Sequence, residues 1–155
     1  MQKYWFEGVY TRNLLFAGAL CFSARQALCH PNEFRQRTGM KVESRRPETL
    51  AVPDAVAIGA FRILEEALTN IARHSGATRV KVTVGENEGF LQLVIQDNGK
   101  GISDADRTAP DAYGLIGMKE RALILGGTVE IDSGKRGTVI TARIPLGDDS
   151  SVHRR

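Results

Sequence analysis

The chain has little cysteine, no long hydrophobic run and no strong excess of either charge. Each of these shortages excludes a class of protein. Two cysteines, Cys21 and Cys29, among 155 residues are too few for a disulfide framework. Cys29 is followed by His30, but the ligand set is incomplete for a metal site, so we expect reduced thiols. The net charge is only +3 and the basic residues are scattered, so we expect no nucleic-acid partner.

An apolar run at residues 14–22 is nine residues long, whereas a membrane span needs about twenty. Lys3 and Arg12 precede this run as in a signal peptide, but Glu7 lies between them and the cleavage pattern of small residues is poor. We therefore expect residues 1–33 to form an irregular N-terminal segment, which could be the remnant of an upstream region, in a cytoplasmic chain.

The composition that remains is that of an ordinary globular domain with extra glycine. Hydrophobic residues make up 42% and charged residues 25%, close to the average of soluble proteins, which allows one hydrophobic core. The 16 glycines exceed the roughly 7% that is usual, and many lie in the second half of the chain. We expect a single domain over residues 34–147 and a disordered tail over residues 148–155.

Hydrophobic periodicity predicts both helices and strands along this domain. The strongest pattern is a helix at residues 54–74, where apolar residues such as Leu64 and Leu68 repeat at helical spacing. Asp54 could cap this helix, and Gly76 stops it. The other predicted elements are a short helix at 32–38, strands at 40–45, 78–84 and 90–97, a polar loop at 102–113, a helix at 114–125, and a hairpin of strands at 128–132 and 137–146.

The order of these elements predicts an α/β fold. Neighbouring strands that are joined by short turns pair antiparallel, so the sheet should be mixed but largely antiparallel. The amphipathic helices should then cover one face of the sheet, which makes a two-layer α/β sandwich. No internal repeat is visible in the sequence.

Glu66 and Asn70 are four residues apart on the predicted helix, so their side chains share one face. The amide oxygen of Asn70 can ligate Mg²⁺, a hard cation that prefers oxygen. Glu66 can accept a proton from an attacking nucleophile or orient it. Arg73, one turn further along, can reach a phosphate oxygen. Because an ordinary solvated helix face would show the same residues, this motif needs support from elsewhere.

Support comes from an acidic residue at a strand end. Asp97 shares its parity with Ile95, so its carboxylate faces the apolar side of the strand. A buried carboxylate without a partner is costly, and the exocyclic amine of adenine would be a suitable donor. Thr138 shares parity with Ile140, should also face inward, and could bridge Asp97 to the base through its hydroxyl or a water. The alternative is that Asp97 only caps the loop that follows it.

Glycines stand where a nucleotide would approach the backbone. Gly99 and Gly101 let the loop after Asp97 come close to a ligand or adopt positive φ. Gly114 and Gly117 open the predicted second helix, and the free N–H groups and dipole of a helix N-terminus attract anions. Either pair alone is common in turns, but two glycine segments that frame a polar loop after Glu-x-x-x-Asn indicate ATP chemistry.

Over residues 61–146 the sequence resembles the catalytic ATP-binding domain of sensor histidine kinases, in the GHKL superfamily that includes gyrase B subunits and MutL. Residues 65–75, 114–122 and 126–131 are similar to the subfamily that works with NarL-type response regulators, and a fainter likeness covers residues 37–43. The resemblance implies the GHKL-type ATPase fold, protein histidine kinase activity, and ATP and Mg²⁺ as cofactors.

The resemblance also implies a role for each motif residue. Glu66 matches the glutamate that acts as general base or orients the nucleophile, and Asn70 matches the Mg²⁺-binding asparagine. Arg73 matches the basic phosphate contact. Asp97 matches the aspartate that reads adenine, and Thr138 the threonine near adenine. The glycines that match the nucleotide pocket and the second glycine box beside the phosphates are Gly99, Gly101, Gly114 and Gly117.

Such a kinase transfers the γ-phosphoryl group to a histidine on a separate dimerisation domain, acts as a homodimer, and signals to a response regulator, here of NarL type. His30, His74 and His153 lack the surroundings of that acceptor, so we expect it on another segment or subunit. Residues 102–113 match the lid over ATP. Two alternatives are a serine kinase of the anti-sigma-factor type, which has the same boxes, and a nucleotide-sensing module without catalysis.

Overall fold

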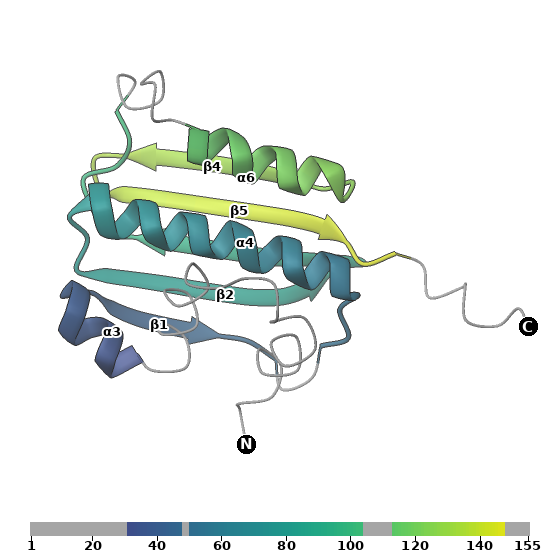
Figure 1. Ribbon diagram of the computed structural model, residues 1–155, viewed down its shortest axis with the longest axis horizontal. Helices are drawn as coiled ribbons and strands as arrows, with labels where there is room; N and C mark the ends of the chain where they lie inside the picture. Colours follow the sequence, from purple (N-terminus) through teal and green to yellow (C-terminus); the bar gives the residue numbers. More distant parts are fainter. Residues whose placement is uncertain (1–30, 48–49, 104–112, 148–155) are drawn as a thin grey trace, which may run out of the picture.

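A five-stranded sheet with helices packed against it forms the structure, a computed structural model that describes residues 31–47, 50–103 and 113–147 (Figure 1). Of the predicted irregular segment 1–33, only residues 31–33 are described, and they belong to a helix. Residues 104–112 of the loop predicted at 102–113, and the predicted tail at 148–155, lie outside the described residues. The elements are α3 (Pro31–Thr38), β1 (Lys41–Arg45), α4 (Asp54–Asn70), η1 (Ile71–Ser75), β2 (Arg79–Asn87), β3 (Phe90–Asp97), α6 (Tyr113–Ile124), β4 (Thr128–Gly134) and β5 (Gly137–Pro145).

The strand order in the sheet is β1-β2-β3-β5-β4. Strands β1 and β2 are parallel, whereas β2–β3, β3–β5 and β4–β5 are antiparallel. The predicted mixed, largely antiparallel sheet is therefore confirmed. Because Gln96 of β3 pairs with Val139 of β5, the next residues, Asp97 and Thr138, come to lie beside each other at one end of the two inner strands.

Helices α4 and α6 lie side by side on one face of the sheet, and α3 lies next to β1 (Figure 1). This arrangement confirms the predicted two-layer architecture. No helix within the described ranges is long and apolar enough to cross a membrane. The buried apolar residues of α4 are Val56, Ala57, Ala60, Phe61, Ile63, Leu64, Ala67 and Leu68. They share one core with inward-facing strand residues that include Val80, Val82, Leu91, Leu93, Ile95, Ile140, Ala142 and Ile144.

Both ends of helix α4 differ from the sequence-based expectation. Pro53 occupies the N-cap position and no side chain caps the helix, so the predicted capping by Asp54 is wrong. Asp54 is already the first helical residue, where its negative charge still complements the helix dipole. At the other end the chain widens into a π-helical turn at Ile71–Ser75 instead of continuing as α-helix. Gly76, with φ of 64°, then ends the helix as predicted.

The β2–β3 hairpin is longer than predicted. Strand β2 continues to Asn87, which pairs with Phe90, and only Glu88 and Gly89 form the turn. Both turn residues have positive φ, 53° and 79°, as two-residue hairpins of the primed type require. The tight turn fixes the register of the two strands and thereby directs their alternate apolar residues into the core.

The core should tolerate truncation far less than the outer face of α6. Leu64 is 1% exposed, so Leu64→Ala should lower the free energy of unfolding by about 2–5 kcal/mol, measured by urea denaturation. Leu123 is 72% exposed, and the control Leu123→Ala should change the free energy of unfolding by no more than about 0.5 kcal/mol. Similar losses in the two variants would contradict this packing.

Candidate functional site

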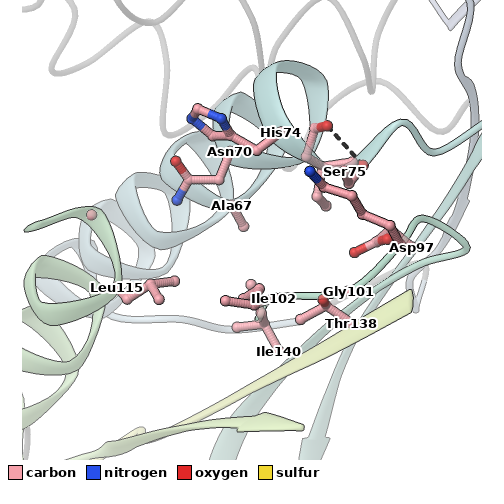
Figure 2. A pocket seen from close by; sticks show the side chains of 13 residues that line it. Ala67, Asn70, His74, Ser75, Asp97, Gly101, Ile102, Leu115, Thr138 and Ile140 are labelled. Atoms are coloured by element: carbon pink, nitrogen blue, oxygen red, sulfur yellow. Dashed lines mark hydrogen bonds between the residues drawn. The ribbon is translucent and has the colours of Figure 1, made fainter. Parts of the chain in front are cut away.

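A cavity of about 280 Å³ opens between the end of α4, the start of α6 and the adjoining ends of β3 and β5 (Figure 2). This volume is close to the lower end of the range for small-ligand pockets, about 300–1,000 Å³. Its wall combines apolar residues with a few convergent polar groups, as ligand sites commonly do. The lining residues are Ala67, Asn70, Ile71, His74, Ser75, Asp97, Lys100, Gly101, Ile102, Gly114, Leu115, Thr138 and Ile140.

Asp97 lies in the cavity wall at the end of β3. It is only 4% exposed, which confirms the predicted inward orientation. Its Oδ1 accepts a hydrogen bond from the backbone N–H of Gly99 at 2.7 Å. Asp97 therefore also caps the loop that follows it, which was the alternative role considered from the sequence. One such bond uses only part of the acceptor capacity of a carboxylate, which has about four lone-pair sites. The remaining capacity is available to a ligand in the cavity.

Thr138 lies beside Asp97 in the wall and is also 4% exposed, so its predicted inward orientation is confirmed (Figure 2). Its hydroxyl oxygen is 2.8 Å from that of Ser133 on β4. Ser133 Oγ in turn accepts a hydrogen bond from the N–H of Ile102 at 2.7 Å. Ser133 was missed in the sequence, although a two-residue turn after Gly134 places it directly opposite Thr138 in the hairpin.

Ser75, which the sequence analysis also missed, joins the π-helical turn to the glycine loop. Its hydroxyl donates to the carbonyl oxygen of Ile71 at 2.8 Å and accepts from the N–H of Ala77 at 3.0 Å. Its own carbonyl oxygen accepts from the N–H of Lys100 at 2.9 Å. Gly99 passes so closely that a Cβ there would collide with the Ser75 carbonyl oxygen. This close approach explains why glycine follows Asn98.

Asn98 holds the same loop from the other side. Its Oδ1 accepts hydrogen bonds from the N–H groups of Thr78 and Arg79, at 3.0 and 2.9 Å. Its Nδ2 donates to the hydroxyl oxygen of Thr78 at 3.0 Å. The loop that carries Asp97 is therefore fixed to the start of β2 as well as to the end of the α4–η1 helix.

Glu66, Asn70 and Gly114 meet where α6 begins against α4. A Cβ on Gly114 would collide with Glu66 Oε1 and would lie 3.1 Å from Asn70 Nδ2, so a larger residue there would displace the Glu66 side chain. Asn70 and Gly114 line the cavity, and Glu66 is half-buried beside them without lining it. The structure thus brings these three predicted site residues together.

Arg73 and Gly117 lie outside the cavity wall. Arg73 is exposed, and the next residue, His74, lines the cavity although the sequence analysis gave His74 no role in the site. A Cβ on Gly117 would lie 3.0 Å from Nη1 of Arg121, so this glycine faces its own helix's arginine. Gly101, by contrast, lines the cavity with φ of 78°, a conformation that favours glycine.

Glu65, the neighbour of Glu66 in the chain, is a buried acid with a perturbed pKa. It is 7% exposed, and its Oε2 lies 3.2 Å from Nη1 of Arg62. Its Oε1 makes no hydrogen bond to any residue that the structure describes. Burial raises the pKa of Glu65 above its usual value, against the lowering effect of Arg62. The two neighbouring glutamates thus have different surroundings: Glu65 is buried beside Arg62, whereas Glu66 faces the start of α6.

Comparison with known proteins identifies the family of the chain. Residues 55–148 match the family model described as histidine kinase-, DNA gyrase B-, and HSP90-like ATPase. The chain belongs to this family. The match covers more than half of the sequence and confirms the GHKL resemblance, and membership in an ATPase family of this kind implies that the domain binds ATP.

Curated proteins with similar sequences are named as a sensor histidine kinase and as a sensor protein. Sensor histidine kinase LiaS of Bacillus subtilis (strain 168) is 39% identical over 116 residues, which cover 74% of this chain and 32% of LiaS. Sensor protein VraS of Staphylococcus aureus (strain COL) is 42% identical over 101 residues, which cover 64% of this chain and 29% of VraS. The chain thus spans about a third of the length of these relatives.

Solved structures of histidine kinases share the fold of this ATPase domain. The histidine kinase domain of the Erythrobacter litoralis EL346 blue-light activated kinase superposes with a TM-score of 0.64 at 22% identity, over 82% of this chain and 61% of that one. Histidine kinase AdeS of Acinetobacter baumannii superposes with a TM-score of 0.61 at 16% identity, over 83% of this chain and 64% of that one.

The contact between Gly99 and Ser75 can be tested by adding a single methyl group to the ATPase domain. Gly99→Ala should lower the free energy of unfolding by about 1–3 kcal/mol, because the new Cβ meets backbone that cannot move aside easily. Gly85 on β2 has open space around its Cβ position, and Gly85→Ala should change the value by no more than about 0.5 kcal/mol. Urea denaturation measures both, and a neutral Gly99→Ala would be inconsistent with this close contact.

Proposed function

We propose that this domain binds Mg·ATP in the cavity and transfers the γ-phosphoryl group to a histidine outside the described residues. The observation that carries the proposal is Asp97, a carboxylate that is 4% exposed and faces a cavity of about 280 Å³, across from Asn70 (Figure 2). Beyond Gly99, a carboxylate buried in this way needs a further donor, and the exocyclic amine of adenine supplies one.

The adenine base would lie at the Asp97 end of the cavity. Ile71, Ile102 and Ile140 line the wall and can cover the faces of an aromatic ring. Thr138 would contact the base directly or through a water. Asp97, as an acceptor, would favour adenine over guanine, because guanine presents a carbonyl oxygen where adenine presents an amine.

The phosphates would lie toward Asn70 and the start of α6. No cluster of three or more His, Cys, Asp or Glu residues in the described ranges could hold a metal ion by itself. The amide oxygen of Asn70 fits Mg²⁺ that is held jointly with phosphate oxygens, the usual arrangement at nucleotide sites. Bound there, Mg²⁺ would neutralise phosphate charge. Sequence motifs assign three further residues to the phosphates. They are Arg73, which is exposed, and the two glycines of the second glycine box, Gly114 and Gly117.

Glu66 would act on the nucleophile. It stands beside Asn70, where α6 begins, and a carboxylate there can accept a proton from the acceptor histidine or orient it. The other residues position the nucleotide, since phosphoryl transfer depends mainly on alignment and charge neutralisation. The half-buried position of Glu66 supports this role over that of an ordinary solvated residue.

The acceptor would be a histidine on a dimerisation domain, and the intact protein would act as a homodimer with its catalytic part in the cytoplasm. The names of the relatives, sensor histidine kinase and sensor protein, support a response regulator as the next partner. The boxes at residues 65–75 and 114–122 favour a regulator of NarL type.

Replacing Asp97 tests the adenine contact. Asp97→Asn should raise the Kd for ATP at least tenfold, since hydrogen bonds to charged groups contribute about 1.5–3 kcal/mol. Stability should fall much less, because the amide oxygen can still accept from Gly99. Calorimetric titration and urea denaturation measure the two effects, with the exposed Asp132→Asn as control. Equal losses of binding and stability would mean that Asp97 is only structural.

Replacing Glu66 tests catalysis. Glu66→Gln should leave ATP affinity within about threefold but slow phosphoryl transfer to a separate dimerisation domain by about 10²–10⁴-fold. Transfer of radiolabelled γ-phosphate measures this, with the exposed Glu130→Gln as control. An unchanged rate would favour a non-catalytic nucleotide sensor. An acid-stable phosphoprotein product would point instead to a serine kinase, because phosphohistidine is acid-labile.

A further inference from the structure

Ser133 lies behind the cavity wall, and it contacts three residues that line the cavity. Its Oγ accepts a hydrogen bond from the N–H of Ile102 at 2.7 Å and lies 2.8 Å from the hydroxyl oxygen of Thr138. It also lies 3.1 Å from the position that a Cβ on Gly101 would take. Ser133 therefore contacts both the end of the glycine loop, at Gly101 and Ile102, and strand β5, at Thr138.

Either hydroxyl can donate to the other, and the direction of this hydrogen bond decides what Thr138 presents to the cavity. A hydroxyl has one proton and two lone pairs, and the Ile102 N–H already occupies one lone pair of Ser133. The hydroxyl oxygen of Thr138, 2.8 Å away, is an acceptor in reach of the Ser133 proton. If Ser133 donates its proton there, the proton of Thr138 is free to point into the cavity. The reverse direction would turn the Thr138 proton toward Ser133 and away from the cavity.

The cavity wall then presents two complementary groups side by side, an acceptor at Asp97 and a donor at Thr138. Adenine offers the matching pair on its Watson–Crick edge, the N6 amine as donor and N1 as acceptor. We propose that Ser133 is a positioning residue for base recognition: it orients the hydroxyl of Thr138 so that Thr138 donates to N1 of adenine, directly or through one water. This inference rests on the proposed binding of ATP in the cavity.

The test compares ATP with 1-deaza-ATP, in which a C–H group replaces N1 of adenine. By calorimetric titration the domain should bind ATP about 3- to 10-fold more tightly than the analogue, the typical contribution of one hydrogen bond. Ser133→Ala should weaken ATP binding and bring this ratio below about 2. The exposed Ser44→Ala should leave the ratio unchanged.

The ratio of the two affinities distinguishes base recognition from a purely structural role of Ser133. If Ser133→Ala weakens both nucleotides equally, Ser133 is only structural and the inference is wrong. If Ser133→Ala does not fold, Ser133→Cys replaces it, because a thiol is a weak donor, and an unchanged ratio in that variant contradicts the inference. If the unaltered domain binds neither nucleotide, the proposed function itself fails.

Discussion

The burial of the Asp97 carboxylate is the constraint on which the rest of the site depends. A charged group that is 4% exposed must be hydrogen-bonded, and the described residues supply one backbone donor, the N–H of Gly99. To make that bond the chain must curl back immediately after β3, against the carbonyl oxygen of Ser75. The glycine loop, the cavity beside it and the orientation of Thr138 all follow from placing an acid at the inward end of this strand.

Two networks of hydrogen bonds keep the acid in place from opposite sides. Asn98 ties the loop to the first residues of β2, and Ser75 ties it to the π-helical turn that ends the α4 segment. The widened turn is therefore a structural part of the site, consistent with the frequent occurrence of π-turns at functional positions. Because Asn70 directly precedes this turn, its position relative to Asp97 depends on the same connections.

Residue periodicity predicted the features that depend on one element at a time. The alternation through Ile95 gave the inward orientation of Asp97, and helical spacing placed Glu66 and Asn70 on one face of α4. Features that arise between elements were missed: Ser75 and Ser133 act through partners about 25 and 31 residues away, Lys100 and Ile102. Short-range patterns carry no signal for such contacts, and the switch from α- to π-helix after Asn70 likewise reflects tertiary packing.

The proposed base end and phosphate end of the cavity rest on different parts of the fold. Asp97 and Thr138 sit on inner strands of one sheet, where paired hydrogen bonds resist displacement. Glu66 and Asn70 instead face Gly114, the second residue of α6, across a close contact that a side chain at Gly114 would disturb. Any shift of α6 therefore changes the surroundings of Glu66 first and those of Asp97 only afterwards. Under the proposed function, the sheet would govern nucleotide recognition and the helix–helix contact would govern phosphoryl transfer, so the two could vary separately.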